Sequence, residues 1–271
     1  MYTFIDIHSH VHGKEYDADR EALMKELADF GGATITIGTD YEESERARET
    51  AERYSNVYFC AGIHPVDKRD EVYDREKLRE LATHPKCVGI GECGLDYYWP
   101  SECKWESGEE VEKARQRELF EGQIKLALEM NLPLMIHGRP SRGSMDAYRD
   151  IIVILSEHKK VYGEKLRGNI HFFVGTVEIA KKFIELDFTM SFTGVITFSS
   201  DYDEVLHYLP IEYIQAETDS PYVSPKPYRG KRNEAKHVRE VIERMAQLRD
   251  STKEELEKQL LANAKRVWGI D

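Results

Sequence analysis

The chain has 271 residues, and its 38 basic and 50 acidic side chains give a formal net charge of −12. This acidic balance argues against a protein that coats nucleic acid over a long footprint, because such proteins are usually basic. It leaves phosphate chemistry at a metal site open, because bound cations supply local positive charge. The sequence predicts no membrane span and no signal peptide, since its apolar runs are short and the first twenty residues lack a basic start and an apolar core.

Four cysteines, Cys60, Cys87, Cys93 and Cys103, occur without a CxxC pair and without zinc-ribbon spacing. We therefore expect free thiols in a reducing compartment, which favours a cytoplasmic location. A chain of this length buries enough surface to fold without disulfide support.

Short segments rich in β-branched and aromatic residues alternate with amphipathic ones along the whole chain. The expected strands are Thr3–Ile7, Ala33–Ile37, Val57–Ile63, Cys87–Ile90, Pro133–Ile136, Gly168–Phe173, Phe188–Phe192 and Tyr213–Ala216. Eight strands alternating with helices predict an α/β fold, a closed (β/α)₈ TIM barrel, as a single domain over residues 1–271. An open doubly wound sheet is disfavoured, because no glycine-rich phosphate turn follows the first strand.

Apolar residues at helical spacing mark the segments between these strands. The predicted buried faces are Leu23, Leu27 and Phe30; Phe120, Ile124, Ala127 and Leu128; Val238, Val241, Ile242, Met245 and Leu248; and Leu256, Leu260, Leu261, Ala264 and Val267. The last helix begins near Ser251, where Ser251/Glu254 and Thr252/Glu255 both have capping-box spacing. Two long polar loops are expected, at Trp99–Glu112 and, with four basic residues, at Tyr222–Asn233.

The run Asp6-Ile7-His8-Ser9-His10 places three possible metal ligands at a spacing of two in the first strand. Because side chains alternate between the faces of a strand, all three are expected on the same side. Two imidazoles at the end of one strand supply half of a site for a divalent ion.

Further ligands recur where later strands end. They are His64, Glu92, His137, His171 and Asp219, with Arg139 two residues after His137. Any one of them alone could be a turn residue, a helix cap or a buried core histidine. Their recurrence at strand ends, which meet at one face of a barrel, favours a metal site. We expect His12, His84, His158, His207 and Cys93 to be structural or surface residues.

Histidines combined with a bridging carboxylate hold two divalent ions ~3.5–4 Å apart, which suits in-line displacement at phosphorus. Several histidines favour zinc, manganese or iron over a pure magnesium site. The sequence leaves the identity open among Mg, Mn and Zn.

The motifs at these positions resemble those of the TatD-type metal-dependent deoxyribonucleases of the amidohydrolase superfamily. The matching stretches are D-I-H-S-H, G-I-H-P, G-E-C-G-L-D-Y, L-P-L-M-I-H-G-R, I-H-F-F, E-T-D-S-P-Y and N-A-K-R-V-W, which run from Asp6 to Trp268. The resemblance implies one metal held by His8, His10, Glu92 and Asp219. It implies a second metal held by Glu92, His137 and His171.

The chain departs from the family pattern at three places. Ala235 stands where the family commonly has a proline after Arg-Asn-Glu, Phe172 follows His171 in place of a cysteine, and the Trp99–Glu112 loop is long. Because these changes lie off the ligands, they bear on substrate selectivity.

The activity implied is hydrolysis of phosphodiester bonds in DNA, as a 3'-5' exonuclease on single strands. Catalytic roles fall to Glu92, Asp219 and His64, with Asp219 as the proton acceptor. His64 and Arg139 would bind the phosphate, with Glu217 and Asp96 orienting ligands. Aromatic residues Tyr97, Tyr98, Trp99 and Tyr222 could stack unpaired bases.

Two alternatives remain. The same barrel could hydrolyse an ester, as in editing of D-aminoacyl-tRNA, or bind without catalysis. The sequence indicates neither a membrane nor an obligate protein partner.

Overall fold

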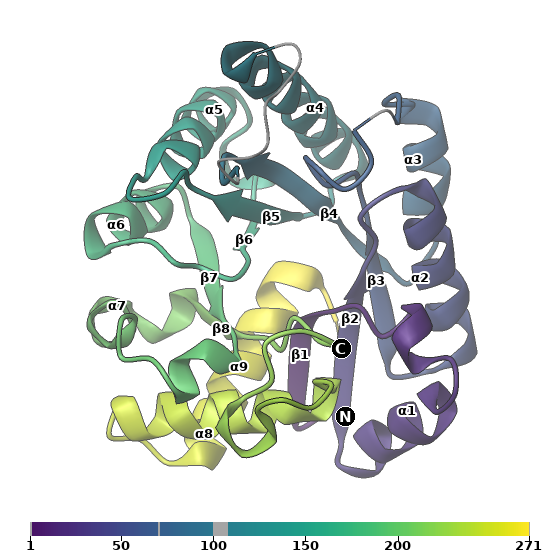
Figure 1. The fold of residues 1–271 in the computed structure, drawn as a ribbon, viewed down its shortest axis with the longest axis vertical. Coiled ribbons are helices and arrows are strands. Elements are labelled where there is room, and N and C mark those ends of the chain that lie inside the picture. The colour runs from purple at the N-terminus through teal and green to yellow at the C-terminus, as the bar shows by residue number, and fades with distance from the viewer. Residues whose placement is uncertain (1, 70, 100–107, 271) are drawn as a thin grey trace.

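The computed structural model describes residues 2–69, 71–99 and 108–270, and eight parallel strands in sequential order form its sheet (Figure 1). The strands are β1 (Phe4–Ser9), β2 (Gly32–Ile37), β3 (Val57–Ala61), β4 (Cys87–Asp96), β5 (Leu134–Arg139), β6 (Gly168–Ile170), β7 (Phe188–Phe192) and β8 (Ile214–Ala216). Each expected strand is present, and the predicted (β/α)₈ barrel is confirmed.

Helices α1 to α8 surround the strands, whereas α9 lies behind them in the view of Figure 1. The helices are α1 (Arg20–Asp29), α2 (Tyr41–Arg53), α3 (Arg75–Ala82), α4 (Glu109–Met130), α5 (Asp146–Tyr162), α6 (Val177–Glu185), α7 (Asp203–Tyr208), α8 (Val238–Leu248) and α9 (Lys253–Trp268). Short 3₁₀ turns include η1 (Lys14–Tyr16) and η3 (Gly194–Thr197). None of the helices built from described residues has the length and hydropathy needed to cross a bilayer.

The barrel is closed between β1 and β8 near the carboxyl ends of these strands. The described residues show one isolated parallel bridge there, between Ser9 and Ser220. The His10 N–H donates to the Ser220 carbonyl at 2.7 Å, and the Asp219 N–H donates to the His8 carbonyl at 2.9 Å. The backbone segments that close the barrel therefore also carry the expected ligands His8, His10 and Asp219.

The apolar stripes of the helices are buried or packed against the core as expected, with one exception. The five apolar residues predicted for α8 are all buried, and so are Leu256, Leu260, Ala264 and Val267 of α9. Phe30 was expected beside Leu27 on a buried face, but its side chain is 47% exposed. That prediction is wrong because α1 ends at Asp29, which leaves Phe30 as the C-cap rather than on the continuing helical face.

Three of the cysteines, Cys60, Cys87 and Cys93, are free and buried, as expected. Cys103 and most of the Trp99–Glu112 loop lie outside the described residues.

The capping box of α9 uses the second of the two expected pairs. The Thr252 hydroxyl accepts from the Glu255 N–H, and the Glu255 carboxylate accepts from the Thr252 N–H at 3.2 Å. Replacing Thr252 by alanine should therefore lower the free energy of unfolding by ~1 kcal/mol. Urea unfolding measures this loss, and Thr252→Ser, which keeps the capping hydroxyl, serves as the control.

Candidate metal centre

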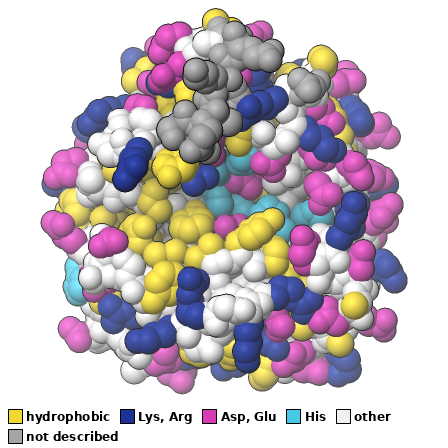
Figure 2. Space-filling view, in the orientation of Figure 1, with side chains coloured by type: hydrophobic (Ala, Val, Ile, Leu, Met, Phe, Trp, Pro, Cys, Tyr) yellow, Lys and Arg dark blue, Asp and Glu magenta, His cyan; other side chains and the backbone are white. Residues whose placement is uncertain are grey.

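A cavity of about 750 Å³ opens at the carboxyl ends of the strands. The expected site residues His10, His64, Glu92, His137, Arg139, His171 and Asp219 line it, together with His12, Glu43, Asp67, Asp96, Phe172 and Tyr222. Figure 2 shows the histidines of this cavity at the bottom of a central hollow. The sequence prediction that these strand ends converge on one face therefore holds in space.

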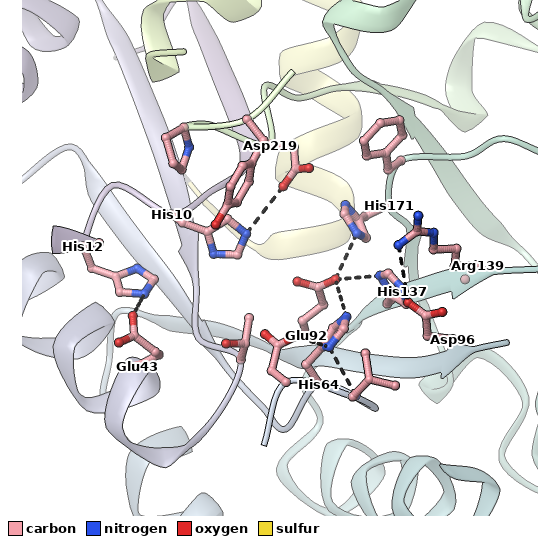
Figure 3. Close-up of a pocket in the computed structure, with 18 of the residues that line it drawn as sticks. His10, His12, Glu43, His64, Glu92, Asp96, His137, Arg139, His171 and Asp219 are labelled. Atoms are coloured by element: carbon pink, nitrogen blue, oxygen red, sulfur yellow. Dashed lines mark hydrogen bonds and ion pairs between the residues drawn. The ribbon is translucent and has the colours of Figure 1, made fainter. Parts of the chain in front are cut away.

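Glu92 sits at the centre of the cluster because β4 is irregular at this point. The β4–β5 register shifts between Ile90 and Cys93, so the strand bulges at Glu92 and re-aims its side chain. The nearest nitrogens of His137, His171 and His64 lie 2.9, 3.0 and 3.7 Å from Glu92 Oε1 (Figure 3). One buried carboxylate thus faces imidazoles from three other strand ends.

The glycines of the G-E-C-G motif permit the close contact between β4 and β5 on which this arrangement depends. A Cβ atom at Gly91 would lie 2.4 Å from the Met135 carbonyl oxygen, and one at Gly94 would lie 2.1 Å from that of His137. Both glycines also have positive φ values, 152° and 136°, which side chains disfavour. The motif therefore brings Glu92 and His137 together through the backbone.

A second group forms where β1 meets the segment after β8. His8 Nε2 lies 3.6 Å from Glu92 Oε2 and 3.7 Å from Asp219 Oδ1, and His10 Nε2 lies 3.5 Å from the same Asp219 oxygen. Asp219 has φ of 53°, a left-handed conformation that is rare outside glycine and often found at functional sites.

Asp6 does not join this group, contrary to the expectation from simple alternation. The β1–β2 register shifts between Asp6 and Ser9, within the run that carries His8. Its carboxylate instead accepts from the Thr218 N–H at 2.8 Å and from the Thr218 hydroxyl at 2.6 Å. Asp6 thus holds the residue before Asp219.

Several site imidazoles are oriented through the nitrogen that faces away from the centre. His10 Nδ1 pairs with the Ile37 carbonyl at 2.9 Å, His171 Nδ1 with Glu217 at 3.2 Å, and His64 Nδ1 with Asp67 at 2.8 Å. His137 Nε2 pairs with Asp96 at 3.1 Å. Such outer partners fix the tautomer and leave the other nitrogen free to bind a metal. Asp96 and Glu217 therefore lie where orienting residues were expected.

His8 supplies the test of whether this site fits a metal. Its side chain is fully buried, yet neither Nδ1 nor Nε2 has a hydrogen-bond partner. A buried polar atom without a partner is costly, so native proteins rarely leave one. The Nε2 atom instead faces two carboxylate oxygens at distances too long for hydrogen bonds. An ion ~2 Å from each atom fits between them, so the donor set suits a divalent metal.

The electrostatics match a site prepared for a cation. Burial and the neighbouring His171 hold the pKa of His8 well below its usual value, so its ring is neutral and its lone pair available. Burial favours a raised pKa for Glu92, but His171 and His64 outweigh it and keep the pKa well below the usual range. Burial lowers the pKa of His137. The hydrogen bonds with Asp96 and Glu92 outweigh this effect and raise the pKa to about 9.

Sequence reasoning did not foresee the wall formed by His12 and Glu43. The two side chains pair at 3.0 Å, and His12 Nδ1 also contacts the Thr36 hydroxyl at 2.7 Å (Figure 3). The interpretation of His12 as structural agrees with its burial but misses its position in the cavity wall. The available signal was its spacing of two from His10.

The expected aromatic rim is only partly present. Tyr222 is 57% exposed and its ring centre lies 6.2 Å from that of His10, so it stands at the mouth. Tyr98 is also exposed, and the Arg139 guanidinium lies 4.2 Å from its ring centre. Tyr97 is buried and donates to Asp150, so the expectation that it stacks on bases is wrong. Trp99 is partly buried and donates to the Asp96 carbonyl.

Comparisons with known proteins agree with this geometry. The model of a family described as "TatD related DNase" matches residues 5–269. The chain belongs to this family.

Curated TatD relatives match the chain over nearly its whole length. The "Uncharacterized metal-dependent hydrolase YabD" of Bacillus subtilis is 36% identical, over 98% of this chain and 99% of that protein. The "3'-5' ssDNA/RNA exonuclease TatD" of Shigella flexneri is 31% identical, over 98% of both chains. A crystal structure of YJJV, a TatD homologue from Escherichia coli, superimposes with a TM-score of 0.85 at 26% identity, covering 99% of both chains. The protein is therefore an enzyme of the TatD family, a metal-dependent hydrolase.

Proposed function

We propose that this TatD-family protein hydrolyses phosphodiester bonds in DNA with two divalent metal ions, as a 3'-5' exonuclease on single strands. The observation that carries the proposal is the position of Glu92, whose two oxygens face separate groups of ligands. A carboxylate placed between two groups of ligands would allow two metal ions to be held side by side, as in two-metal phosphodiester hydrolysis. The relative named as an exonuclease on single-stranded DNA and RNA supports this substrate class.

The first proposed metal site consists of His8, His10, Glu92 and Asp219, and the second of Glu92, His137 and His171. Bound ions would supply a water molecule of lowered pKa and would neutralise charge on the phosphate. Three or more histidines suit Zn or Mn better than Mg alone. Glu217 and Asp96 hold the outer nitrogens of His171 and His137, and so set the ring orientations.

His64, Arg139 and Asp219 are assigned to the substrate. Arg139 is 54% exposed at the side-chain level and lines the cavity, so its guanidinium can reach a phosphate from solvent. His64 Nε2 points at Glu92 from 3.7 Å, where it can donate to a phosphate oxygen beside the metals. Asp219 carries the remaining carboxylate near His8 and His10, and it orients the attacking water and accepts its proton.

Metal binding should release protons and should strengthen as the pH rises. The pKa of His137 in the metal-free protein is about 9, so below pH 9 a metal must displace its proton. The raised pKa of His171 acts in the same direction. We expect metal affinity to rise between neutral pH and about pH 9 and then to level off. Calorimetry in two buffers of different ionisation enthalpy counts the protons; none released at neutral pH would contradict the ligand assignment.

Hydrolysis of an end-labelled single-stranded oligonucleotide tests the activity. Metal-stripped protein, re-supplied separately with Mg, Mn and Zn, should shorten the strand from its 3' end, and His137→Ala should not. A D-aminoacyl-tRNA ester is the competing substrate in the same assay. Faster turnover of that ester, or no shortening by protein that has bound metal, would overturn the proposal.

A further inference from the structure

The loop of residues 222–233 carries three exposed cations. Lys226, Arg229 and Lys231 are exposed, and none of them forms an ion pair with a carboxylate of the described residues. Their neighbours differ, because Arg232 pairs with Asp19 and Lys236 pairs with Glu26. In a chain with net charge −12, three exposed cations on one loop are a local reversal of the overall charge.

This loop begins at the cavity. Pro221 and Tyr222 line the cavity, and the loop then passes over η3, where the Lys226 N–H donates to the Thr197 hydroxyl at 2.8 Å. Figure 2 shows Lys and Arg side chains below the histidine-lined hollow, over the segment that leads from β8 to α8. A polymer that leaves the cavity past Pro221 and Tyr222 would meet these cations.

The loop is held in one shape by internal hydrogen bonds. The fully buried Asn233 donates to the carbonyls of Thr218 and Tyr222, at 3.0 and 2.7 Å. The Ser224 hydroxyl donates to the Lys231 carbonyl at 2.5 Å. The cations are thus presented on a fixed backbone, which lowers the entropic cost of binding.

Exposed aromatic rings lie on the same side as the cations. Tyr222 is 57% exposed and Phe198 is 44% exposed, and the Arg229 guanidinium lies 4.2 Å from the centre of the Phe198 ring. Basic side chains interleaved with aromatic faces are how proteins bind single strands without reading their sequence.

We propose that the 222–233 loop binds the outgoing part of the single strand, with backbone phosphates at Lys226 and Lys231 and a base against the Arg229–Phe198 pair. This inference rests on the proposed function and names the surface that binds nucleotides beyond the scissile bond.

The test compares Lys226→Ala/Lys231→Ala with a matched variant, Lys160→Ala/Lys165→Ala. The matched pair is also exposed and carries the same charge, but it lies where α5 leads into the amino end of β6, opposite the cavity. Binding of a fluorescent oligonucleotide of about 15 nucleotides to chelator-treated protein is followed by anisotropy across a salt series. A trinucleotide provides the comparison that is too short to extend along the loop.

Loss of two phosphate contacts should reduce the slope of log affinity against log salt by about 1.4. Over a fourfold rise in salt, the wild type should then lose about sevenfold more affinity than the loop variant. The Lys160/Lys165 variant should keep the wild-type slope, and trinucleotide binding should change in neither. An unchanged slope in the loop variant, or equal losses in both variants, would overturn the inference. If the strand binds in this way but is never cut with metal present, the proposed function fails while the binding surface stands.

Discussion

Replacing Glu92 by glutamine should abolish hydrolysis, with a loss of at least about a thousandfold, equal to ~4 kcal/mol of transition-state stabilisation. Glu92 is buried, and its two oxygens face His8 on one side and His137 and His171 on the other. Glutamine keeps the size of the side chain but removes the charge and one acceptor oxygen, so neither proposed metal site keeps its bridge. Elemental analysis should show loss of bound metal in parallel with the loss of activity.

Glu112→Gln is the matched control for this variant. Glu112 is also a buried carboxylate, but it pairs with Arg115 and Gln116 on α4 and does not line the cavity. This variant should retain its metal and its activity. A Glu92→Gln protein that is folded, loaded with metal and active would remove the bridging carboxylate from the mechanism.

The barrel could be predicted from the sequence because each of its strands is short, apolar and bounded by polar segments. Apolar patterns of this kind indicate buried segments, and all eight strands are largely buried. The strand ends were harder to place, since β4 was expected to stop at Ile90 but continues to Asp96, and β6 stops at Ile170, before His171. The residue at which a strand ends depends on hydrogen bonds to the neighbouring strand. The sequence of one segment does not show which residues of the neighbouring strand it will pair with.

The convergence of the candidate ligands could be predicted for a related reason, because such side chains stand out where an apolar strand ends. Their geometry could not. Alternation put Asp6 on the same side as His8 and His10, but the β1–β2 register is irregular there and the Asp6 carboxylate binds Thr218. The Glu92 bulge depends on the contact of Gly91 and Gly94 with β5, which is a property of two strands together. The pairing of residues far apart in the sequence therefore determines the geometry of the site, which the local sequence pattern could not predict.

Asp6→Asn should destabilise the protein and weaken metal binding, although Asp6 is not a ligand. Asp6 is fully buried, and its two oxygens accept from the N–H and the hydroxyl of Thr218, the residue before Asp219. With the amide oxygen toward the Thr218 N–H, the amide NH₂ would face the Thr218 hydroxyl, which would have to stop donating and accept instead. We expect the free energy of unfolding to fall by about 2 kcal/mol. Urea unfolding of the metal-free protein measures this loss without any contribution from bound ions.

The effect on metal follows from how the barrel closes. Two contacts hold Asp219 in place. The preceding residue, Thr218, binds Asp6, and the Asp219 N–H donates to the His8 carbonyl. Loss of the first contact would therefore let Asp219 leave its left-handed conformation. Affinity at the site of His8, His10 and Asp219 should therefore fall more than affinity at the site of His137 and His171. Thr218→Val, which removes the hydroxyl but keeps the backbone N–H bond, should show a smaller loss in both measurements. Equal behaviour of Asp6→Asn and the wild type would mean that Asp219 is positioned by β1 alone.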